Sequence, residues 1–426
     1  MREDLLHFVW KHGKFPQDSL VTTTGEPIEV VSLGTHNHLS GPDFFNAQLR
    51  ISGQLWAGNV EVHIRSSHWY AHKHETDAKY ANVILHVVWE HDREIVGGDG
   101  NFLPTLQLRD HIPEALLDRY ERLFKGQRKT DVNCRTDIRN VPEFLFQNWL
   151  DRLYLERLEG KSTRVEALLK ASHNNWEQVL FVLMMERFGS KINGPHFHQV
   201  ATHIPFVLVR KLYGQPLQME ALFMGMAGLL ERGTVEDEHY LALQREFRFL
   251  KHKYGLELPV TGPPEFFGLR PANFPTVRLA QLAAFYAHRQ NVFQTLMDVG
   301  RATLADLFAV PLLPYWDHHY NFGKPSRKQK KRISARFLDL LVINVLAPLG
   351  FCHARHLKGT ATQPVLDQME AIAAEQNSIL KKYADLGVPP ANAKEAQAML
   401  QLYQQYCTQN KCLQCAVGAQ LLQGKS

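Results

Sequence analysis

The feature that most constrains the fold is a strand-like run, residues 59–65, in which polar and apolar residues alternate. Successive side chains of a strand point to opposite faces of a sheet, so Glu61 and His63 share one face while the aliphatic residues between them share the other. Asp43 opens an earlier strand-like run directly after Pro42. The pattern predicts a half-buried sheet that presents an acid and an imidazole side by side, with a second acid on the neighbouring strand.

Periodicity predicts further elements around these runs: a helix over residues 2–11, a strand over 27–33, a helix over 69–80 and an apolar strand over 83–89. The gap of 18 residues between Asp43 and Glu61 indicates a tight hairpin at Ser52 and Gly53. Strict alternation would place Asp43 on the same face as Phe45. Asp43 is therefore expected at the start of its strand, or a β-bulge has to follow it.

The order helix, three strands, helix, strand, with these acids, resembles the core of the PD-(D/E)XK nuclease superfamily. This chain has His63 where that superfamily has lysine. The resemblance implies hydrolysis of phosphodiester bonds in DNA or RNA. Asp43 and Glu61 would bind Mg²⁺ or Mn²⁺, and His63 would orient or deprotonate the attacking water. Gln48 and Glu3 are weaker candidates for completing the site.

A second hypothesis for this site uses imidazole ligands and binds Zn²⁺, Mn²⁺ or Fe. Its candidate ligands are His68, His72, His74 and Asp77, with Glu61 and His63. His72 and His74 are two positions apart, however, so the pair would not share one face of a helix. A surface role or a contact with substrate is then expected for both. His86, inside the apolar strand, is expected to be a hydrogen-bonded core residue.

Helical periodicity replaces strand periodicity from Pro113 onward, and a segment rich in Pro and Gly interrupts it at residues 256–275. The expected fold class is α+β. A nuclease-like α/β domain with a mixed sheet flanked by helices is expected over residues 1–112. Helical segments follow over 113–255 and 256–426, and they can form a single, larger all-α domain.

A basic run without any acid precedes an apolar helix, and its charged members are Lys324, Arg327, Lys328, Lys330, Lys331 and Arg332. Such a run can follow a phosphate backbone, and aromatic residues between Trp316 and Phe322 could stack on bases. A solvated loop is the alternative. The net charge of +5 over 426 residues permits a polyanionic partner without establishing one. Nucleic acid is the expected partner, and nothing indicates the oligomeric state.

The spacing Cys407-x4-Cys412-x2-Cys415 suits three thiolate ligands of an iron–sulfur cluster or of Zn²⁺. A fourth ligand has to come from Cys352 or Cys134. Some recombination and CRISPR-associated exonucleases resemble this arrangement, with three of four cluster cysteines near the C-terminus. The alternative is that these cysteines are small buried residues.

The chain is expected to be cytoplasmic. Its N-terminus is acidic where a secretory signal would be basic, and no apolar run approaches the roughly 20 residues of a membrane span. An odd number of cysteines fits a reducing compartment.

Several longer stretches identify the chain as a member of an uncharacterised bacterial family, a domain of unknown function. They are GPDFFNAQL, GNVEVHIRSSHW, YANVILHVVW, RPANFPTVRLAQLA, WDHHYNFG, LVINVLAP and YCTQNKCLQCAVG. This resemblance covers the whole chain and implies no activity. Besides the nuclease, two functions stay open: a non-catalytic nucleic-acid-binding or scaffold protein on a degenerate nuclease fold, and a histidine-ligated metal hydrolase of another substrate.

Overall fold

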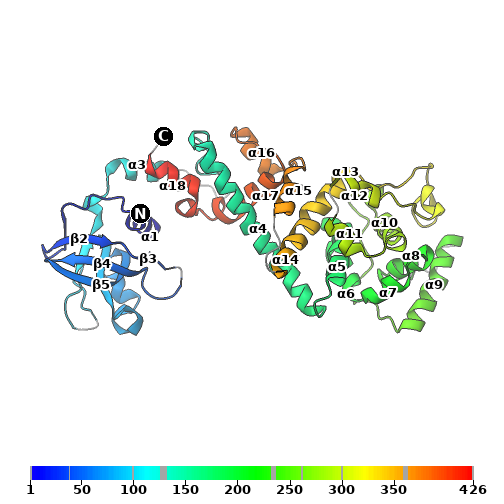
Figure 1. Cartoon of the computed structure of the whole chain (residues 1–426), viewed down its shortest axis with the longest axis horizontal. Coiled ribbons are helices and arrows are strands. Elements are labelled where there is room, and N and C mark those ends of the chain that lie inside the picture. Colours follow the sequence, from blue (N-terminus) through cyan, green and yellow to red (C-terminus); the bar gives the residue numbers. More distant parts are fainter. Residues whose placement is uncertain are drawn as a thin grey trace. The chain divides into compact units, whose positions relative to one another are not determined.

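The chain forms two compact units, which combine a mixed sheet with many helices in an α+β fold (Figure 1). The computed structural model describes residues 2–37, 39–97, 100–124, 132–231, 237–260, 262–298, 301–357 and 363–424. The first unit comprises Met1–Trp149, Leu386–Val388 and Leu402–Ser426, and the second comprises Leu150–Asp385 and Pro389–Gln401. This division differs from the boundaries expected at 112 and 255, because the last segment of the chain packs with the sheet.

A mixed sheet is the centre of the first unit. Its strand order is β1 (Leu20–Val21), β2 (Pro27–Ser32), β4 (Phe44–Ile51), β5 (Gln54–Arg65), β6 (Val83–Glu90) and β7 (Thr105–Gln107), with β3 (Thr35–His36) paired to β4. Strands β2, β4 and β5 are antiparallel, whereas β5, β6 and β7 run parallel. The strands predicted over 27–33 and 83–89 are therefore confirmed as β2 and β6.

The β4–β5 hairpin turns at the predicted residues. Ser52 and Gly53 both have positive φ, 50° and 81°, as the two-residue turns of hairpins require. Near the other end of β4, the register with β5 shifts between Phe44 and Ala47, and Asn46 has a φ of 57°. This bulge lies just after Asp43, at the strand start, which resolves the conflict with strict alternation.

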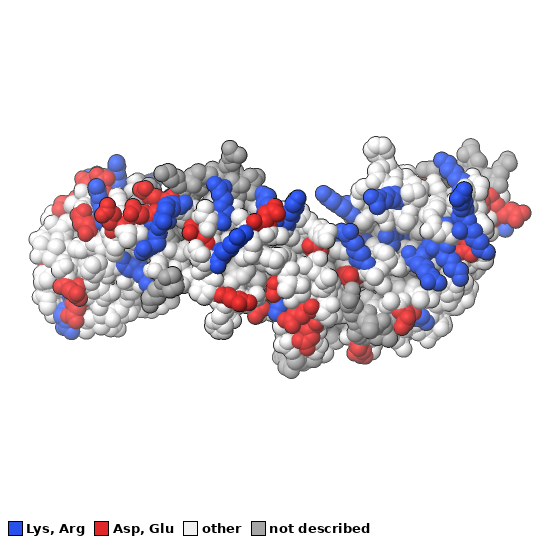
Figure 2. All heavy atoms as spheres, turned by 90° about the horizontal axis from the view of Figure 1, so that it is seen from above, with Lys and Arg blue, Asp and Glu red and all other residues white. Residues whose placement is uncertain are grey.

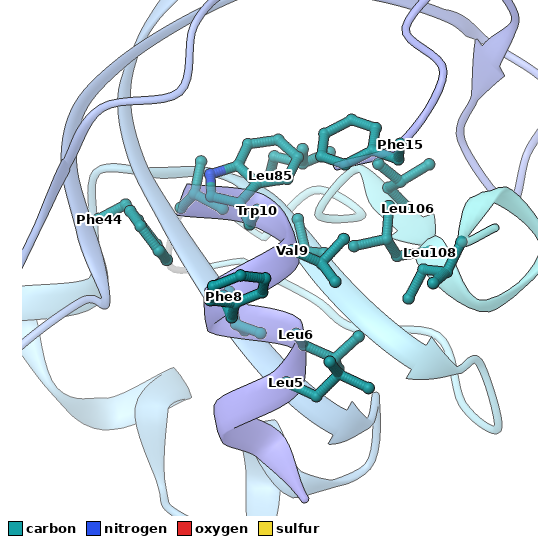
Figure 3. Packing of buried hydrophobic residues seen from close by; sticks show 14 of the residues in the cluster. Leu5, Leu6, Phe8, Val9, Trp10, Phe15, Phe44, Leu85, Leu106 and Leu108 are labelled. Atoms are coloured by element: carbon teal, nitrogen blue, oxygen red, sulfur yellow. The ribbon is translucent and has the colours of Figure 1, made fainter. Parts of the chain in front are cut away.

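Helix α1 (Glu3–Lys11) covers the apolar face of the sheet. Figure 3 shows its apolar side chains facing residues of the strands, including Leu85 of β6 and Leu106 of β7. Trp10 also stacks on Phe15, with ring centroids 5.5 Å apart. The packed face of α1 leaves Glu3 and His7, four residues apart, on the half-buried side of the helix.

The helix predicted over residues 69–80 is wrong as a continuous element. The chain forms only α2 (His68–Ala71), followed by two single 3₁₀ turns, η1 (His74–Thr76) and η2 (Ala78–Tyr80). Lys73 has a left-handed φ of 61°, which ends the helical path. Asp77 then caps η2, because its Oδ1 accepts the backbone N–H of Lys79 at 3.0 Å.

Further elements of the first unit are η3 (Leu108–His111), α3 (Glu114–Phe124), η4 (Ile138–Asn140), the π-helical η8 (Leu402–Cys407), η9 (Cys412–Gln414) and α18 (Ala416–Gln423). Helices α3 and α18 pack together, and the Arg119 guanidinium donates to the Leu422 carbonyl at 2.9 Å. Leu116 and Leu422 belong to the same core as α1. The C-terminal segment is thus part of the sheet unit.

The second unit is helical. Its elements are α4 (Glu143–Ala171, which begins in the first unit), α5 (Trp176–Phe188), α6 (Ser190–Thr202), α7 (Phe206–Lys211), α8 (Pro216–Met226), α9 (Glu238–Tyr254), η5 (Pro271–Asn273), α10 (Pro275–His288), α11 (Val292–Asp298), α12 (Arg301–Leu307), η6 (Pro314–Asp317), the hairpin β8 (His319–Asn321) and β9 (Lys324–Pro325), α13 (Ala335–Leu341), the π-helical η7 (Val342–Leu346), α14 (Ala347–His356), α15 (Gln363–Glu370), α16 (Ser378–Asp385) and α17 (Ala393–Gln401).

The continuous helical stretch Ala335–His356 is long and apolar enough to cross a membrane by length and composition. However, 72% of its most apolar window is buried inside the structure. Such burial is typical of the core helix of a soluble protein.

Candidate metal centre

Titratable side chains from several elements of the first unit gather around the start of β4 and the strand β5. They are Glu3 and His7 of α1, Asp43 before β4, Glu61 and His63 of β5, His72 and His74 beyond α2, and His86 of β6. The parallel pairing of β5 with β6 sets Glu61 opposite His86.

Asp43 and Glu61 lie beside each other and are held by reciprocal hydrogen bonds. The backbone N–H of Asp43 donates to Glu61 Oε2 at 3.1 Å, and the backbone N–H of Val62 donates to Asp43 Oδ2 at 3.0 Å. Adjacent antiparallel strands and the bulge after Asp43 make this exchange possible. The structure thus brings together the two acids singled out in the sequence.

Glu61 is 5% exposed, and this environment disfavours its charge. Burial, followed by the negative charges of Asp43 and Glu3, raises the Glu61 pKa to about 9, although the Asp43 backbone N–H acts in the opposite direction. A cation bound between the acids would reverse this effect, because it favours the ionised carboxylates.

Three imidazoles complete a cluster of possible ligands around Glu61. Nitrogen atoms of His63, His72 and His74 lie within 4.8 Å of one another. His63 Nε2 is 3.1 Å from His72 Nδ1, and Glu61 Oε1 is 3.4 Å from His74 Nε2 and 3.7 Å from His63 Nε2. Ligand atoms around an ion at about 2.1 Å are themselves about 3.0–3.4 Å apart, which is close to the separations of His63 from His72 and of Glu61 from His74 and His63.

The sequence argument against a joint role for His72 and His74 assumed a helix, and that assumption is wrong. The left-handed Lys73 between them redirects the chain. As a result His74, two residues after His72, still lies within reach of the same ring of His63. The His74 Nε2 atom is buried and has no hydrogen-bond partner, as expected of a nitrogen that can bind a metal ion.

Two imidazoles of this cluster, those of His63 and His74, are held neutral. Burial, and then the neighbouring rings of His86, His74, His72 and His68, lower the His63 pKa to about 2. Burial, and then the charge of His72, lower the pKa of His74. Neutral imidazole is the form that binds metals. It follows that His63 suits the role of a ligand better than the expected role of a proton acceptor.

His86 orients the His63 ring through its Nδ1 atom, the nitrogen that does not face the cluster. The Nε2 atom of His86 lies 2.9 Å from His63 Nδ1, so one of the two rings donates to the other. His86 is fully buried, and burial is the main reason that its pKa falls to about 3. This contact leaves His63 Nε2 directed at the cluster, in the way that outer partners orient metal-binding histidines. The sequence-based expectation of a hydrogen-bonded core histidine agrees with the structure at Nε2, whereas the buried Nδ1 of His86 has no hydrogen-bond partner.

His7 was missed from the sequence. Its Nε2 lies 3.2 Å from Asp43 Oδ2, and the pair faces Glu3. Burial alone would lower the His7 pKa, but the contact with Asp43 and the charges of both acids outweigh it, so the pKa is raised. The available signal was the spacing of four residues from Glu3, which places both side chains on one face of α1.

Gln48 and Asp77 are not brought into the cluster. Gln48 pairs with Ala57, four residues along β5 from Glu61, which corresponds to about 13 Å. Asp77 is exposed and caps η2, and its charge reaches the cluster only as a minor influence on the His74 pKa. The ring of Tyr80 stacks on His74, with centroids 3.7 Å apart, and covers one side of the cluster.

The basic run lies in the second unit, where Lys324, Arg327, Lys328, Lys330 and Arg332 are exposed. Figure 2 shows Lys and Arg gathered over this unit, at the right of the view, with few acids among them. Lys331 is different, because it is 8% exposed. Its Nζ donates to the carbonyls of Asp317 and Gln329 and lies 4.0 Å from the centre of the Tyr320 ring. Lys331 is therefore a structural residue and does not offer its charge to a nucleic acid.

Two of the aromatic residues expected to stack on bases are also buried. Trp316 is 1% exposed, and its indole N–H donates to Glu220 Oε1 at 2.9 Å. Phe322 packs on Trp316 with ring centroids 5.6 Å apart. Both side chains belong to the core of the helical unit, so they are not available as stacking surfaces.

The expected four-cysteine set required Cys352 to lie with the C-terminal cysteines, but Cys352 is not in the same unit as they are. It belongs to the second unit, where its thiol groups with Glu166 and His356. Cys407, Cys412 and Cys415 belong to the first unit, together with Cys134. Cys134 was the other cysteine considered from the sequence. It is therefore the one that shares a unit with the three C-terminal cysteines.

No curated protein and no solved structure matches this chain. Residues 3–378 match a family described as "Protein of unknown function (DUF2851)". The match spans most of the 426 residues and ends before the C-terminal cysteines. The chain thus belongs to the DUF2851 family of proteins of unknown function.

Proposed function

We propose that the first unit is a metal-dependent hydrolase that cleaves phosphodiester bonds of nucleic acid. The observation that carries the proposal is the convergence of His63, His72 and His74, whose nitrogen atoms lie within 4.8 Å of one another, with Glu61 beside His63 and His74. Asp43 adjoins this group through Glu61. A buried acid with a pKa of about 9, beside neutral imidazoles, is an arrangement that a divalent cation would stabilise.

The donor set favours a particular class of metal. Mg²⁺ prefers oxygen ligands, whereas imidazole nitrogens together with a carboxylate suit Mn²⁺, Fe²⁺ or Zn²⁺. A divalent ion held there would acidify a water molecule and stabilise negative charge on the phosphoryl oxygens. Among the ions considered from the sequence, Mn²⁺ is therefore preferred to Mg²⁺.

His7 is the proposed proton acceptor for the attacking water. Asp43 holds its ring at 3.2 Å and raises its pKa, as a carboxylate does for a catalytic histidine. Attack by water forms a new P–O bond while the bond to the leaving oxygen breaks. The proton of the water passes to His7, and the leaving oxygen takes a proton from solvent.

The order of the elements supports a nuclease over other hydrolases. Helix α1, the antiparallel strands β2, β4 and β5, helix α2 and the parallel strand β6 follow one another in the order expected for a PD-(D/E)XK core. The exposed basic residues of the second unit would supply contacts to phosphates.

The test is cleavage of single- and double-stranded DNA and RNA by the full chain with Mn²⁺, Mg²⁺, Fe²⁺ or Zn²⁺. We expect cleavage with Mn²⁺ that Glu61→Gln and His74→Ala abolish. His12→Ala, an exposed control just after α1, should leave it unchanged. Cleavage that persists in both of the first two variants would refute the proposal, and so would a protein that binds no divalent ion.

A histidine-ligated hydrolase of a different phosphate ester is the second candidate. The imidazole-rich donor set favours it, because the nuclease superfamily has lysine at the position of His63. Hydrolysis of bis(p-nitrophenyl) phosphate by a protein that leaves every nucleic acid intact would select this candidate.

A further inference from the structure

Four cysteines of the first unit lie at one place in the fold, away from the candidate metal centre. Cys407 ends η8, Cys412 begins η9, and Cys415 immediately precedes α18. Cys134 comes from the segment after the sheet, and its thiol lies within electrostatic range of the other three thiols. None of these four cysteines forms a disulfide bond.

The Cys415 thiol is buried at the start of α18, where its side chain is 6% exposed. Cys415 is the N-cap residue of that helix, although its side chain makes no cap hydrogen bond. Burial raises the Cys415 pKa to about 11, and the nearby backbone N–H groups of Gly418 and Val417 act in the opposite direction. A metal bound to this sulfur would favour the thiolate that burial disfavours.

The turn between Cys412 and Cys415 requires a glycine beside it. A Cβ atom at position 418 would lie 2.1 Å from the carbonyl oxygen of Cys412, so only glycine lets the start of α18 approach η9. The backbone N–H of Cys415 also donates to the Cys412 carbonyl at 3.2 Å. These contacts fix the positions of two of the cysteines relative to each other.

Asn133 connects the remaining cysteine to this turn. Its Nδ2 lies 3.1 Å from Asn410 Oδ1 and 3.4 Å from the Cys412 sulfur. Cys134 follows directly, and its carbonyl accepts the backbone N–H of Ile138 at 2.8 Å. The chain is thus anchored on both sides of Cys134, although 273 residues (407 minus 134) separate it from Cys407.

The spacing of the thiols bears on which metal they suit. Four thiolates around one Zn²⁺ lie about 3.8 Å apart, because the Zn–S bond is about 2.3 Å. Among the residues that the structure describes, no three of these sulfurs lie within 4.8 Å of one another. An iron–sulfur cluster distributes its cysteines over several iron atoms and so accepts more widely spaced thiols.

We infer that Cys134, Cys407, Cys412 and Cys415 bind a metal centre through four thiolates, and that this centre is an iron–sulfur cluster. Cys134, not Cys352, is the fourth ligand. The cluster ties the C-terminal segment to the sheet unit. The inference is independent of the proposed hydrolase, because it concerns other residues of the first unit.

The experiment is metal and sulfide analysis of the full chain purified without oxygen. We expect visible colour with iron and acid-labile sulfide in equal amounts. Cys134→Ser and Cys412→Ser should each lose most of both, whereas the control Cys352→Ser should keep them. Circular dichroism of each variant shows whether it is folded.

A second measurement needs no variant. Cysteines of the native wild type are alkylated before and after the metal is removed, and the labelled positions are mapped by mass spectrometry. Joint protection of the four cysteines until the metal is removed supports the inference even if Cys134→Ser does not fold.

Two outcomes overturn the inference: a wild type without bound metal at these cysteines, and a folded Cys134→Ser variant that retains both its iron and its acid-labile sulfide. Colourless protein that carries zinc and loses it in Cys134→Ser would support the four-thiolate site and overturn its identity as a cluster. Cleavage assays play no part, so failure of the hydrolase proposal would leave these results unchanged.

Discussion

At the scale of single residues, the candidate centre depends on which groups are kept neutral. Burial keeps the proton on Glu61 and keeps protons off His63. A bound metal ion would favour loss of the Glu61 proton, because it binds ionised carboxylate. It would bind His63 as it is, because neutral imidazole is the ligand form. These protonation states support the proposed cation site.

The pH dependence of the stability of Glu61→Gln tests whether Glu61 is protonated in the folded chain. The Glu61 pKa is about 9 in the folded chain against 4.5 ordinarily. Between these values the unfolded chain has released a proton that the folded chain retains. Without metal, wild-type stability should therefore fall as pH rises through this window, by at most about 1.4 kcal/mol per pH unit. Glu61→Gln should lack this fall.

The measurement is thermal unfolding in a chelator between pH 5 and pH 8.5. Mn²⁺ should raise the Tm of wild type and leave that of Glu61→Gln almost unchanged. Identical pH dependence of the two proteins would contradict a buried, protonated Glu61.

His7→Ala should lower the cleavage rate about 10²-fold, because it removes the proposed proton acceptor. The acceptor works when deprotonated, so the wild-type rate should rise with pH through the raised pKa of His7. This rise should disappear in His7→Ala while metal binding persists. A pH–rate profile of unchanged shape, with His12→Ala as the control, would exclude His7 from this role.

At the scale of elements, the site is made by local departures from regular structure. The bulge after Asp43 allows an acid at the start of β4 to meet an acid inside β5. The left-handed Lys73 ends α2 and brings His74 back toward His63. Without these two irregularities, ideal strands and helices would keep the ligands apart.

Lys73 offers a direct test, because its side chain is exposed and only its backbone conformation is special. Lys73→Val should destabilise the unit by about 1–2 kcal/mol and weaken Mn²⁺ binding, since a β-branched residue resists positive φ. Lys73→Gly should preserve both. Urea unfolding and metal titration measure the two effects, and equal behaviour of both variants would contradict a role for the left-handed turn.

At the scale of the whole molecule, the candidate centre and the exposed basic residues belong to different units. Lys330 is exposed, whereas its neighbour Lys331 is fixed by carbonyl oxygens and the Tyr320 ring. The same run of charge therefore contains a residue available to a partner and a residue that supports its own fold.

The pair of neighbours gives a prediction for binding. Lys330→Ala should weaken salt-dependent binding of DNA or RNA, reducing the salt slope by about 1, without changing stability. Lys331→Ala should lower the Tm instead. Fluorescence anisotropy at several salt concentrations measures binding, and a Lys330→Ala protein with unaltered affinity and slope would remove this residue from the interface.

The sequence by itself determined the strands, the hairpin at Ser52 and Gly53, and the shared face of Glu61 and His63. These features depend on local periodicity and turn chemistry, which neighbouring residues set. The helix over 69–80 was wrong because apolar spacing does not report one left-handed residue. The family membership also followed from the sequence, since long stretches carry it.

Only the tertiary structure decided which distant residues meet. It paired His7 with Asp43, joined His72 and His74 to His63, buried Lys331 and selected Cys134 over Cys352. The physical reason is that a ligand set forms between segments far apart in the chain. The packing of whole helices and strands decides which of these segments come into contact. The spacing of residues along the chain does not predict it.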